Sequence, residues 1–486
     1  MSSKRFGAAL AMVAMLAGCG GDGGGGGTPT PTASGGTPTP SASNGCTLQA
    51  RERWVFAKMS EWYLFPDTLP VAFAPTSPAA GQSDFDALQD YLDGLTATAR
   101  SQNKDRYFTY VTSVKEENSY FNAGASAGFG VRLSYDDAAR RVTVTEAFEG
   151  APALAAGIDR GTEILAIGTS SGNLRSVSDL FASGGEGAVV DALGPTTAGT
   201  TRVLRIADAA GTREVTVTKS DYTLQPVSPR YGYRIIDDGG TKVGYLNLRT
   251  FISTADDPLR SAFAAFKAAG VTNVIVDFRY NGGGLLSTAE VLSDLLGGNR
   301  QTSDLQAATR FRPSKSAEDE LRYFRREANA IPAMKIAFIG TGATASASEY
   351  VINAFVPYLH GNAALVGANT FGKPVGQIAL DNPDCSDDRL RVIAFALTNA
   401  AGTGDYYNGL AAKMEATCQA GDDLTHPLGD PAEASVAAAL AFLAGRGCTP
   451  IGATASAERV AAFARQREML RPAAPTAAQR ETPGLF

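Results

Sequence analysis

Histidine is scarce in this 486-residue chain, which contains only His360 and His426. Nothing in the neighbouring sequence marks either one as a general base, so hydrolytic chemistry here would need a base of another type. Positive charge is also in deficit, because 49 acidic and 43 basic side chains give a net charge of −6. A chain without a basic surface is a poor ligand for nucleic acids, and we expect no nucleic-acid partner.

The N-terminal apolar run is too short for a permanent membrane-spanning helix. It covers residues 6–16 and follows a short basic region, which is typical of a targeting segment. The run ends in Leu16-Ala-Gly-Cys19, which resembles a bacterial lipobox. The resemblance implies a signal peptide over residues 1–18, acylation of Cys19 and membrane attachment through that lipid anchor. Because Gly20 follows the cysteine, the resemblance also implies that the protein is located at the outer membrane of the cell envelope and faces the periplasm. The alternative is an ordinary secretory signal.

The other cysteines lack the spacing of a metal site. Neither Cys-x-x-Cys pairs nor Cys/His zinc patterns occur, so we expect no metal and no other cofactor. An oxidising periplasm permits disulfides. We expect one bond between Cys385 and Cys418 within the largest domain and another between Cys46 and Cys448 that ties the chain ends together. Four free thiols are the alternative, since pairing depends on a geometry that the sequence does not reveal.

Composition divides the chain into segments. Residues 19–45 are almost entirely Gly, Thr, Pro, Ser and Ala, which predicts a flexible tether or a simple spacer. Residues 46–122 carry apolar stripes with helical spacing and predict a helical cap. Residues 449–486 form an Ala/Arg-rich tail, for which we expect a surface helix followed by a disordered end.

Residues 123–221 alternate between apolar and polar positions like strands. A Gly-Phe-Gly loop precedes the run Gly-Ala-Pro-Ala-Leu-Ala-Ala-Gly-Ile-Asp-Arg-Gly-Thr-Glu-Ile over residues 150–164. This order resembles a PDZ domain, and the alternative is a generic β-rich insert. The resemblance implies a site that adds a peptide as a strand and receives its terminal carboxylate on backbone amides. Its residues would be Gly128, Phe129, Gly130 and Val131.

Residues 222–448 alternate between strands and helices. Apolar runs predict strands at 243–248, 274–278 and 336–340, and an amphipathic pattern predicts a helix at 258–268. This alternation predicts an α/β core.

The segment Thr344-Ala-Ser-Ala-Ser-Glu349 lies between the strand at 336–340 and a helix. Ser346 and Glu349 fit a capping box, so a purely structural role is one interpretation. A nucleophilic role for Ser346 is the other, with Ser348 as the rival nucleophile.

Two further features favour catalysis. Gly282-Gly-Gly284 follows a buried strand, where glycines let amides approach a ligand as in an oxyanion hole, although a flexible turn is the simpler interpretation. Lys373 follows a strand near residue 367, and Gln377 could orient its amine by hydrogen bonding. A lone lysine is more often a surface charge.

Together these segments resemble the C-terminal processing (tail-specific) serine peptidases of family S41, over roughly residues 50–445. The resemblance implies a multidomain α/β protein with a helical cap, a PDZ-like domain and a crotonase-like catalytic core. It implies Ser346 as nucleophile, Lys373 as base and Gln377 as its support. The amides of Ala347 and of Gly283 or Gly284 would hold the oxyanion.

The sequence departs from the family pattern at several positions. Thr344 replaces the usual first serine, Pro374 stands where glycine is common, and the serine-to-lysine spacing (373 − 346 = 27) is longer than expected. Residues 381–424 form an elaboration near the site. None of these changes removes a catalytic group, but they bear on substrate preference.

The function implied is a serine endopeptidase that cleaves envelope or exported polypeptides after PDZ recognition of their exposed C-terminal tails. A buried lysine can act as the base, because burial disfavours its charged form. The alternative is a peptide-binding protein of the same fold that does not cleave. A serine esterase using His360 or His426 is disfavoured, because no Gly-x-Ser-x-Gly turn surrounds Ser346.

Overall fold

The computed structural model describes residues 46–452 and 468–486. Cys19, the signal peptide at 1–18 and the tether at 19–45 lie outside these residues. The described chain is a mixed α/β protein, as expected. No helix within it is long and apolar enough to cross a membrane.

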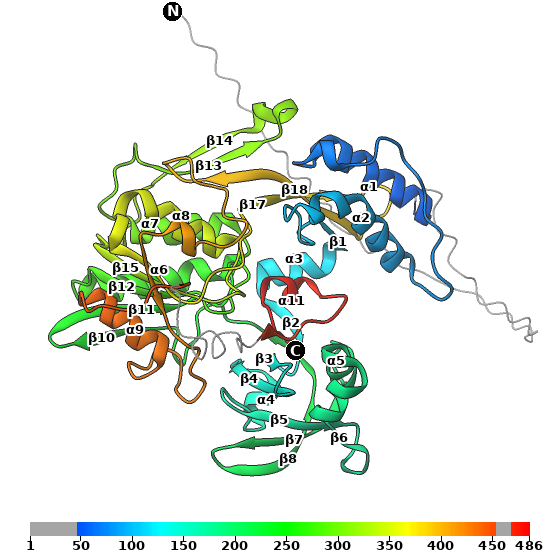
Figure 1. Ribbon diagram of the computed structural model, residues 1–486, viewed down its shortest axis with the longest axis horizontal. Coiled ribbons are helices and arrows are strands. Elements are labelled where there is room, and N and C mark those ends of the chain that lie inside the picture. Colours follow the sequence, from blue (N-terminus) through cyan, green and yellow to red (C-terminus); the bar gives the residue numbers. More distant parts are fainter. Residues whose placement is uncertain (1–45, 453–467) are drawn as a thin grey trace, which may run out of the picture. The chain divides into compact units, whose positions relative to one another are not determined.

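A six-stranded sheet forms the α/β core (Figure 1). Its order is β10-β11-β12-β15-β16-β19, and only the β10–β11 pair is antiparallel. The strands are β10 (Tyr233–Asp238), β11 (Thr241–Asn247), β12 (Asn273–Asp277), β15 (Lys335–Gly340), β16 (Ala363–Gly367) and β19 (Ala416–Gln419). The strands expected near 243, 274 and 336 are therefore confirmed.

Helices cover both faces of this sheet, which explains its nearly continuous apolar strands. Val274 and Val276 pack with helices of one face, whereas the intervening Ile275 packs with α9. The helices of the first face are α6 (Asp256–Ala268), α7 (Leu286–Leu296) and α8 (Ala347–Leu359), and the second face carries α9 (Ala434–Leu443). Short 3-10 helices are η3 (Ser253–Ala255), η5 (His360–Asn362) and η6 (Ala411–Lys413).

A second, antiparallel sheet joins the N-terminal helices to the core. Its long strand β18 pairs with β17, β1 and β13, and β13 pairs with β14. Val55 and Leu92 of the helices pack against Val375 and Val392 of the sheet, so the helices share a core with these strands. The elements are α1 (Leu48–Trp62), η1 (Pro66–Thr68), α2 (Asp84–Ser101), β1 (Tyr110–Ser113), β13 (Leu305–Phe311), η4 (Pro313–Glu318), β14 (Glu320–Tyr323), β17 (Val375–Asp381) and β18 (Asp388–Thr398).

A β-rich unit lies between these segments in the sequence. Its seven-stranded sheet has the order β20-β3-β4-β5-β7-β8, with β6 paired to β5, and a separate ribbon joins β2 to β9. The elements are α3 (Val114–Ala123), β2 (Ala125–Gly128), β3 (Val131–Asp136), β4 (Arg141–Ala147), α4 (Pro152–Ala155), β5 (Glu163–Gly168), η2 (Ser171–Asn173), β6 (Arg175–Ser176), α5 (Val177–Leu193), β7 (Thr201–Asp208), β8 (Gly211–Thr218), β9 (Ser220–Thr223) and β20 (Glu468–Met469). The domain boundaries themselves stay a prediction.

The expectation of a disordered end is wrong for residues 468–486, which we call the tail. Strand β20 pairs with β3, and α11 (Ala477–Glu481) contacts α3, as the red segment of Figure 1 shows. Leu485 and Phe486 are only 1% and 2% exposed. A composition rich in Ala and Arg predicts little burial, but pairing with β3 supplies a partner that is distant in sequence. The expected surface helix falls mainly on residues 453–467, outside the described residues.

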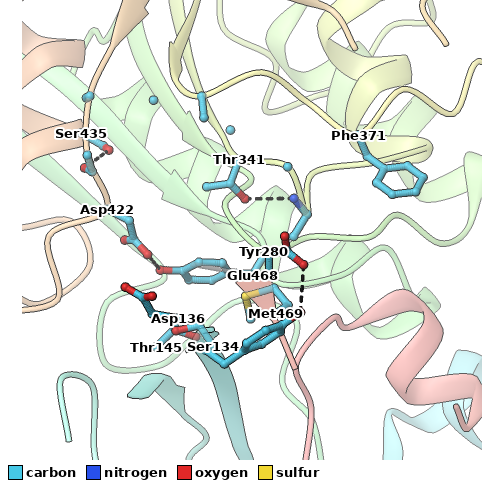
Figure 2. A pocket seen from close by; sticks show the side chains of 18 of the residues that line it. Ser134, Asp136, Thr145, Tyr280, Thr341, Phe371, Asp422, Ser435, Glu468 and Met469 are labelled. Carbon is cyan, nitrogen blue, oxygen red and sulfur yellow. Dashed lines mark hydrogen bonds between the residues drawn. The ribbon is translucent and has the colours of Figure 1, made fainter. Parts of the chain in front are cut away.

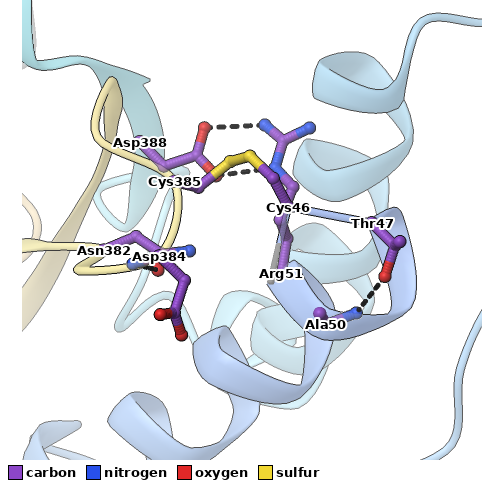
Figure 3. The surroundings of a disulfide bond; sticks show 8 residues. All are labelled: Cys46, Thr47, Ala50, Arg51, Asn382, Asp384, Cys385 and Asp388. Carbon is purple, nitrogen blue, oxygen red and sulfur yellow. Dashed lines mark hydrogen bonds and ion pairs between the residues drawn. A yellow bond between two sulfur atoms is a disulfide. The ribbon is translucent and has the colours of Figure 1, made fainter. Parts of the chain in front are cut away.

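The four expected disulfide cysteines are bonded, but the expected pairing is wrong. Cys46 pairs with Cys385 and Cys418 with Cys448, at Cα–Cα distances of 5.2 and 5.3 Å. Cys385 lies in the turn between β17 and β18, against the start of α1 (Figure 3). The Arg51–Asp388 ion pair, at 2.6 Å, joins the same two segments. The chain after α9 returns to β19, which brings Cys448 to Cys418.

Candidate active site

Ser346 occupies the turn between β15 and α8. Its backbone has φ 54° and ψ −114°, a conformation that is uncommon for a residue other than glycine and often found at active sites. The carboxylate of Glu349 accepts a hydrogen bond from the Ser346 amide at 3.0 Å, which is the glutamate half of the expected capping box. The serine side chain remains partly exposed, unlike its neighbours Ala345 and Ala347.

The other hydroxyls of the segment are committed to structure. Ser348 is fully buried and donates to the Asn281 carbonyl at 3.2 Å, and Thr344 donates to the Phe278 carbonyl at 2.8 Å. Both bonds hold the chain after β12 against the serine turn. Ser348 therefore has neither the exposure nor the free hydroxyl that a nucleophile needs.

Glu349 joins the serine turn to the lysine segment. It is fully buried and accepts from the amides of Gly372 and Lys373, each at 2.7 Å, in addition to that of Ser346. Burial raises the pKa of Glu349, and these hydrogen bonds oppose the rise. Sequence reasoning found only the capping role, because the second contact joins residues 23 and 24 positions apart and no local pattern reports it.

Lys373 and Gln377 meet as expected. The Lys373 Nζ donates to Oε1 of Gln377 at 3.2 Å and lies 5.3 Å from the centre of the Phe108 ring. Gln377 in turn donates to the Phe108 carbonyl, which fixes its orientation. Burial lowers the pKa of Lys373, while the charges of Glu481 and Asp105 oppose this effect. A lysine in this environment loses its proton more readily than one at the surface.

The glycines after β12, Gly282–Gly284, form what we call the cleft loop. Gly283 has φ 121°, and a Cβ there would lie 2.7 Å from the Cβ of Ser346 and 3.2 Å from the Ala347 nitrogen. The Gly283 amide donates to Oδ1 of Asn281 at 2.9 Å, so it is not offered to a ligand. The Gly282 amide instead donates to the Glu481 carbonyl of the tail at 3.1 Å. Sequence reasoning placed the oxyanion donors at Gly283 or Gly284 and did not single out Gly282.

Two cavities adjoin this site. A cavity of about 470 Å³ is lined by Ala345, Lys373 and many tail residues. A larger one of about 960 Å³ lies at the carboxyl ends of β15 and β16, the edge at which ligands bind in parallel sheets. Ala343 and Phe371 line both. Figure 2 shows the larger cavity, with Tyr280, Thr341 and Asp422 beside Glu468 and Met469 of the tail.

The four residues expected to bind a peptide, Gly128–Val131, we call the groove loop. The amides of Gly130 and Val131 donate to the Phe486 carbonyl at 2.8 and 3.1 Å. A Cβ on Gly128 would lie 2.8 Å from the Phe486 carbonyl carbon, so glycine permits this approach. The loop therefore holds a backbone oxygen from the chain's own tail.

Each histidine is paired with a carboxylate, and His360 lies apart from Ser346. His360 follows the last residue of the 13-residue helix α8, about 20 Å along the axis from the serine, and contacts Glu415 at 2.8 Å. His426 contacts Asp423 at 2.6 Å. Nothing in this arrangement favours a histidine base.

Comparison with known proteins agrees with this geometry. Residues 242–404, which hold Ser346, Lys373 and Gln377, match the family model described as peptidase family S41. This match identifies residues 242–404 as a region of the S41 peptidase type. The S41 resemblance expected from the three segments is thus confirmed.

Relatives of this chain include two curated proteins. It is 26% identical over 329 residues to the chloroplastic C-terminal processing peptidase of Tetradesmus obliquus, with 63% of this chain and 66% of the relative covered. It is also 26% identical over 264 residues to the carboxyl-terminal-processing protease of a Picosynechococcus species, with 54% and 58% covered. The chain thus spans less than two thirds of the length of these relatives.

A solved structure shares the fold. The chain superimposes on a Bacteroides fragilis protein assigned to the S41 proteases with a TM-score of 0.60 and 24% identity. The match covers 81% of this chain and 97% of the other.

Proposed function

We propose that this chain is a serine endopeptidase with Ser346 as nucleophile, Lys373 as general base and Gln377 as the residue that orients the lysine. The observation that carries the proposal is the buried Glu349 carboxylate, which binds the amides of Ser346 and Lys373 together. One buried group thus holds the backbone of both residues, which supports their acting together. The partial exposure of Ser346 and the hydrogen bond from Lys373 to Gln377 support the same roles.

The proton balance of the reaction needs only these groups. Neutral Lys373 takes the proton of the Ser346 hydroxyl as Oγ attacks the peptide carbonyl carbon, and the C–N bond breaks when the lysine passes that proton to the leaving amine. Water then attacks the acyl-enzyme, gives its proton to Lys373, and releases the carboxylic acid product as Ser346 regains a proton. Burial of Lys373 supports this role, because it lowers the pKa of the amine.

The oxyanion would be held by the Ala347 amide and by one amide of the cleft loop. Ala347 is the first residue of α8, where amides have no partner within the helix and the helix dipole favours negative charge. Gly283 would serve only in a rearranged loop, since its amide is bound to Asn281. Gly282 already holds a carbonyl oxygen and is the better placed donor.

We further infer that the β-rich unit is a PDZ-like domain that selects substrates by their C-terminal tails. Support comes from the groove-loop amides, which bind a backbone oxygen beside strand β3 as in strand addition. The relatives' names, C-terminal processing peptidase and carboxyl-terminal-processing protease, support the same substrate class. Envelope or exported polypeptides follow as substrates if the N-terminal segment directs export.

Cleavage of casein and of a peptide with a free C-terminus tests the catalytic proposal. Ser346→Ala and Lys373→Ala should each lower kcat by at least about 1000-fold, as expected when a member of a catalytic unit is lost. Ser348→Ala is the matched control and should retain most activity. Equal cleavage by the wild type and both variants would refute the assignment. Binding of peptides without cleavage by any form would favour the non-catalytic alternative.

Membrane attachment through Cys19 is a separate proposal. Cys19→Ser should move the protein from the membrane fraction to the soluble fraction of a Gram-negative host, because acylation would be lost. An unchanged distribution would refute the lipid anchor without touching the catalytic proposal.

A further inference from the structure

The tail lies twice along the edge of one strand, β3. Glu468 and Met469 pair with Tyr135 and Ser134, and the Leu470 amide donates to the Leu133 carbonyl at 3.0 Å. The tail then leaves the strand and returns at Gly484, whose carbonyl accepts from the Leu133 amide at 2.7 Å. Residues 471–483 therefore form a loop that is held at both ends by the same strand.

The returning end fits the groove as a peptide ligand would. The Phe486 amide donates to the Val131 carbonyl at 2.9 Å, while the Phe486 carbonyl accepts from the groove loop. Its ring packs in the apolar core of the β-rich unit, with Phe129, Leu180 and Phe181. Backbone pairing together with one buried side chain is the pattern by which strand-adding domains select a peptide end.

Gly484 makes the return possible. It has φ 82°, and a Cβ there would lie 2.4 Å from Cε of Met469 and 2.7 Å from the Leu133 carbonyl oxygen. Any other residue would be strained by the backbone and by this contact. The two passes of the tail along β3 thus depend on each other.

The loop between the two passes lies against Gly282 and against the cavity beside Lys373, which we call the active-site cleft. The Gly282 amide holds the Glu481 carbonyl, and a Cβ on Gly282 would lie 3.0 Å from Cδ of Pro483. The cavity beside Lys373 is also lined by tail residues 470–473, 475, 479–481 and 483–485. The charge of Glu481 raises the pKa of Lys373, which opposes the deprotonation that a base requires. A substrate chain would have to take the place of this loop.

Polar contacts fix the loop to α3. The Tyr120 hydroxyl lies 2.9 Å from Oγ1 of Thr482, which is fully buried, and Ala477 donates its amide to Glu116 at 2.8 Å. Gln479 donates to the Leu485 carbonyl at 2.9 Å and links the loop to the returning end. Release of Phe486 would therefore loosen the whole loop.

We propose that residues 484–486 are the resident ligand of the β3 groove and that residues 471–483 close the active-site cleft while the groove is occupied. The exogenous ligands of the groove are then polypeptides whose terminal carboxylate follows a large apolar residue. Such an end displaces Phe486 and opens the cleft. The cleavage part of this inference depends on the proposed function, whereas the binding part does not.

Competition within one chain sets the size of the expected effect. A tethered ligand acts at an effective concentration of about 1 mM. If the tail itself binds the groove with an intrinsic Kd of about 10 μM, a free peptide should bind the closed protein about 100-fold more weakly than the open one. Releasing the tail should therefore strengthen binding of the free peptide by about the same factor.

Binding is tested in the Ser346→Ala background, where no cleavage can interfere. The probe is a fluorescent peptide with the sequence of residues 477–486 and a free carboxylate, measured by anisotropy. Phe486→Asp in the chain should tighten its Kd by at least tenfold, because a buried unpaired charge disfavours the resident ligand. Ala474→Asp adds the same charge at an exposed tail position and should change nothing. The amidated peptide should bind more weakly to the open protein.

The same variants test closure when Ser346 is present. Phe486→Asp, but not Ala474→Asp, should cleave casein at least tenfold faster than the wild type, and Gly484→Val should repeat this result by a second route. An unchanged peptide Kd in Phe486→Asp would overturn the inference whatever the activity. Tighter binding with an unchanged cleavage rate would overturn closure. Tighter binding with no cleavage by any variant would confirm the groove ligand and overturn the proposed function.

Discussion

Two glycine loops of this molecule hold the same tail in different ways. The groove loop offers the amides of Gly130 and Val131 to Phe486 and buries that residue's ring, whereas the cleft loop contacts the tail through the single Gly282 amide. Burying a phenylalanine ring and making two hydrogen bonds contributes several times the free energy of one hydrogen bond. The groove is therefore the anchor, and closure of the cleft depends on it.

This difference separates recognition from chemistry. In the proposed reaction the cleft loop accepts a carbonyl that changes geometry, so a tightly held ground state there would slow catalysis. The groove takes no part in bond breaking and can bind its ligand strongly. The cleft must open for a substrate to enter. A weak contact at Gly282 allows this opening, whereas the strong contact at Phe486 holds the tail in the groove.

The largest expected effect is a loss of kcat caused by a substitution that distorts the cleft loop alone. Gly283→Ala would place a methyl group 2.7 Å from the Cβ of Ser346 on a backbone with positive φ, so the serine must move. We expect kcat to fall by at least about 100-fold, the usual cost of a displacement of 1 Å in an active site. Peptide binding in the groove should not change. Gly94→Ala, on an exposed helix position with open space, is the control. Normal kcat in Gly283→Ala would place the reacting serine elsewhere.

The disulfides provide a second way to treat the two regions separately, because residues 123–221 contain no cysteine. The Cys46–Cys385 bond closes a sequence separation of 339 residues and braces the turn after β17, the strand of Gln377, whereas Cys418–Cys448 closes 30. Chain entropy predicts that Cys46→Ser lowers the free energy of unfolding by about 2 kcal/mol more than Cys418→Ser. Denaturant titration measures this difference. Equal losses would contradict the dependence on loop length, and weaker peptide binding in the folded Cys46→Ser protein would show that the cleft and the groove are not separable.

Loosening the two ends of the tail should raise its rate of trypsin cleavage by unequal amounts. Gly484→Val breaks the groove end, and Gly282→Ala places a methyl group 2.9 Å from the Glu481 carbonyl at the cleft end. Trypsin cleavage after Arg471 and Arg480 should rise at least tenfold in Gly484→Val. It should rise only about threefold in Gly282→Ala, the value of one weak hydrogen bond. The reverse order would make the cleft the anchor.

The smallest effect concerns protonation of the base. Burial and Arg391 lower the pKa of Lys373, while Glu481, Asp105 and Glu349 raise it. Glu481→Gln removes one of the raising charges, so the pKa falls further and the neutral base appears at lower pH. The acidic limb of the kcat/KM profile should therefore move to lower pH, with Glu468→Gln, an exposed tail carboxylate, as the control. A limb that stays in place or moves to higher pH would exclude Glu481 from the surroundings of the lysine.

Sequence patterns sufficed where the information was local. The apolar runs of β11, β12 and β15 and the turn at Ser346 follow from neighbouring residues, and Lys373 was found beside Gln377 four positions away. The prediction of the disulfide pairing failed because the pairing depends on how the turn after β17 packs on α1.

The prediction of a disordered tail failed for a related reason. Its large apolar residues are only Met469, Leu470, Leu485 and Phe486, and their burial comes from the edge of β3, more than 300 positions earlier in the chain. Glu349 accepts hydrogen bonds from the amides of both Ser346 and Lys373. The sequence did not predict the second contact, because the capping box already accounts for a glutamate at this position.

The most direct measurement is the rate at which a fluorophosphonate probe labels the protein, followed by intact mass and peptide mapping. We expect a single adduct on Ser346, formed at least tenfold faster in Phe486→Asp than in the wild type or in Ala474→Asp, and no adduct in Lys373→Ala. An adduct on Ser348, or equal labelling rates in all four proteins, would contradict a lysine-activated Ser346 that is closed by the tail.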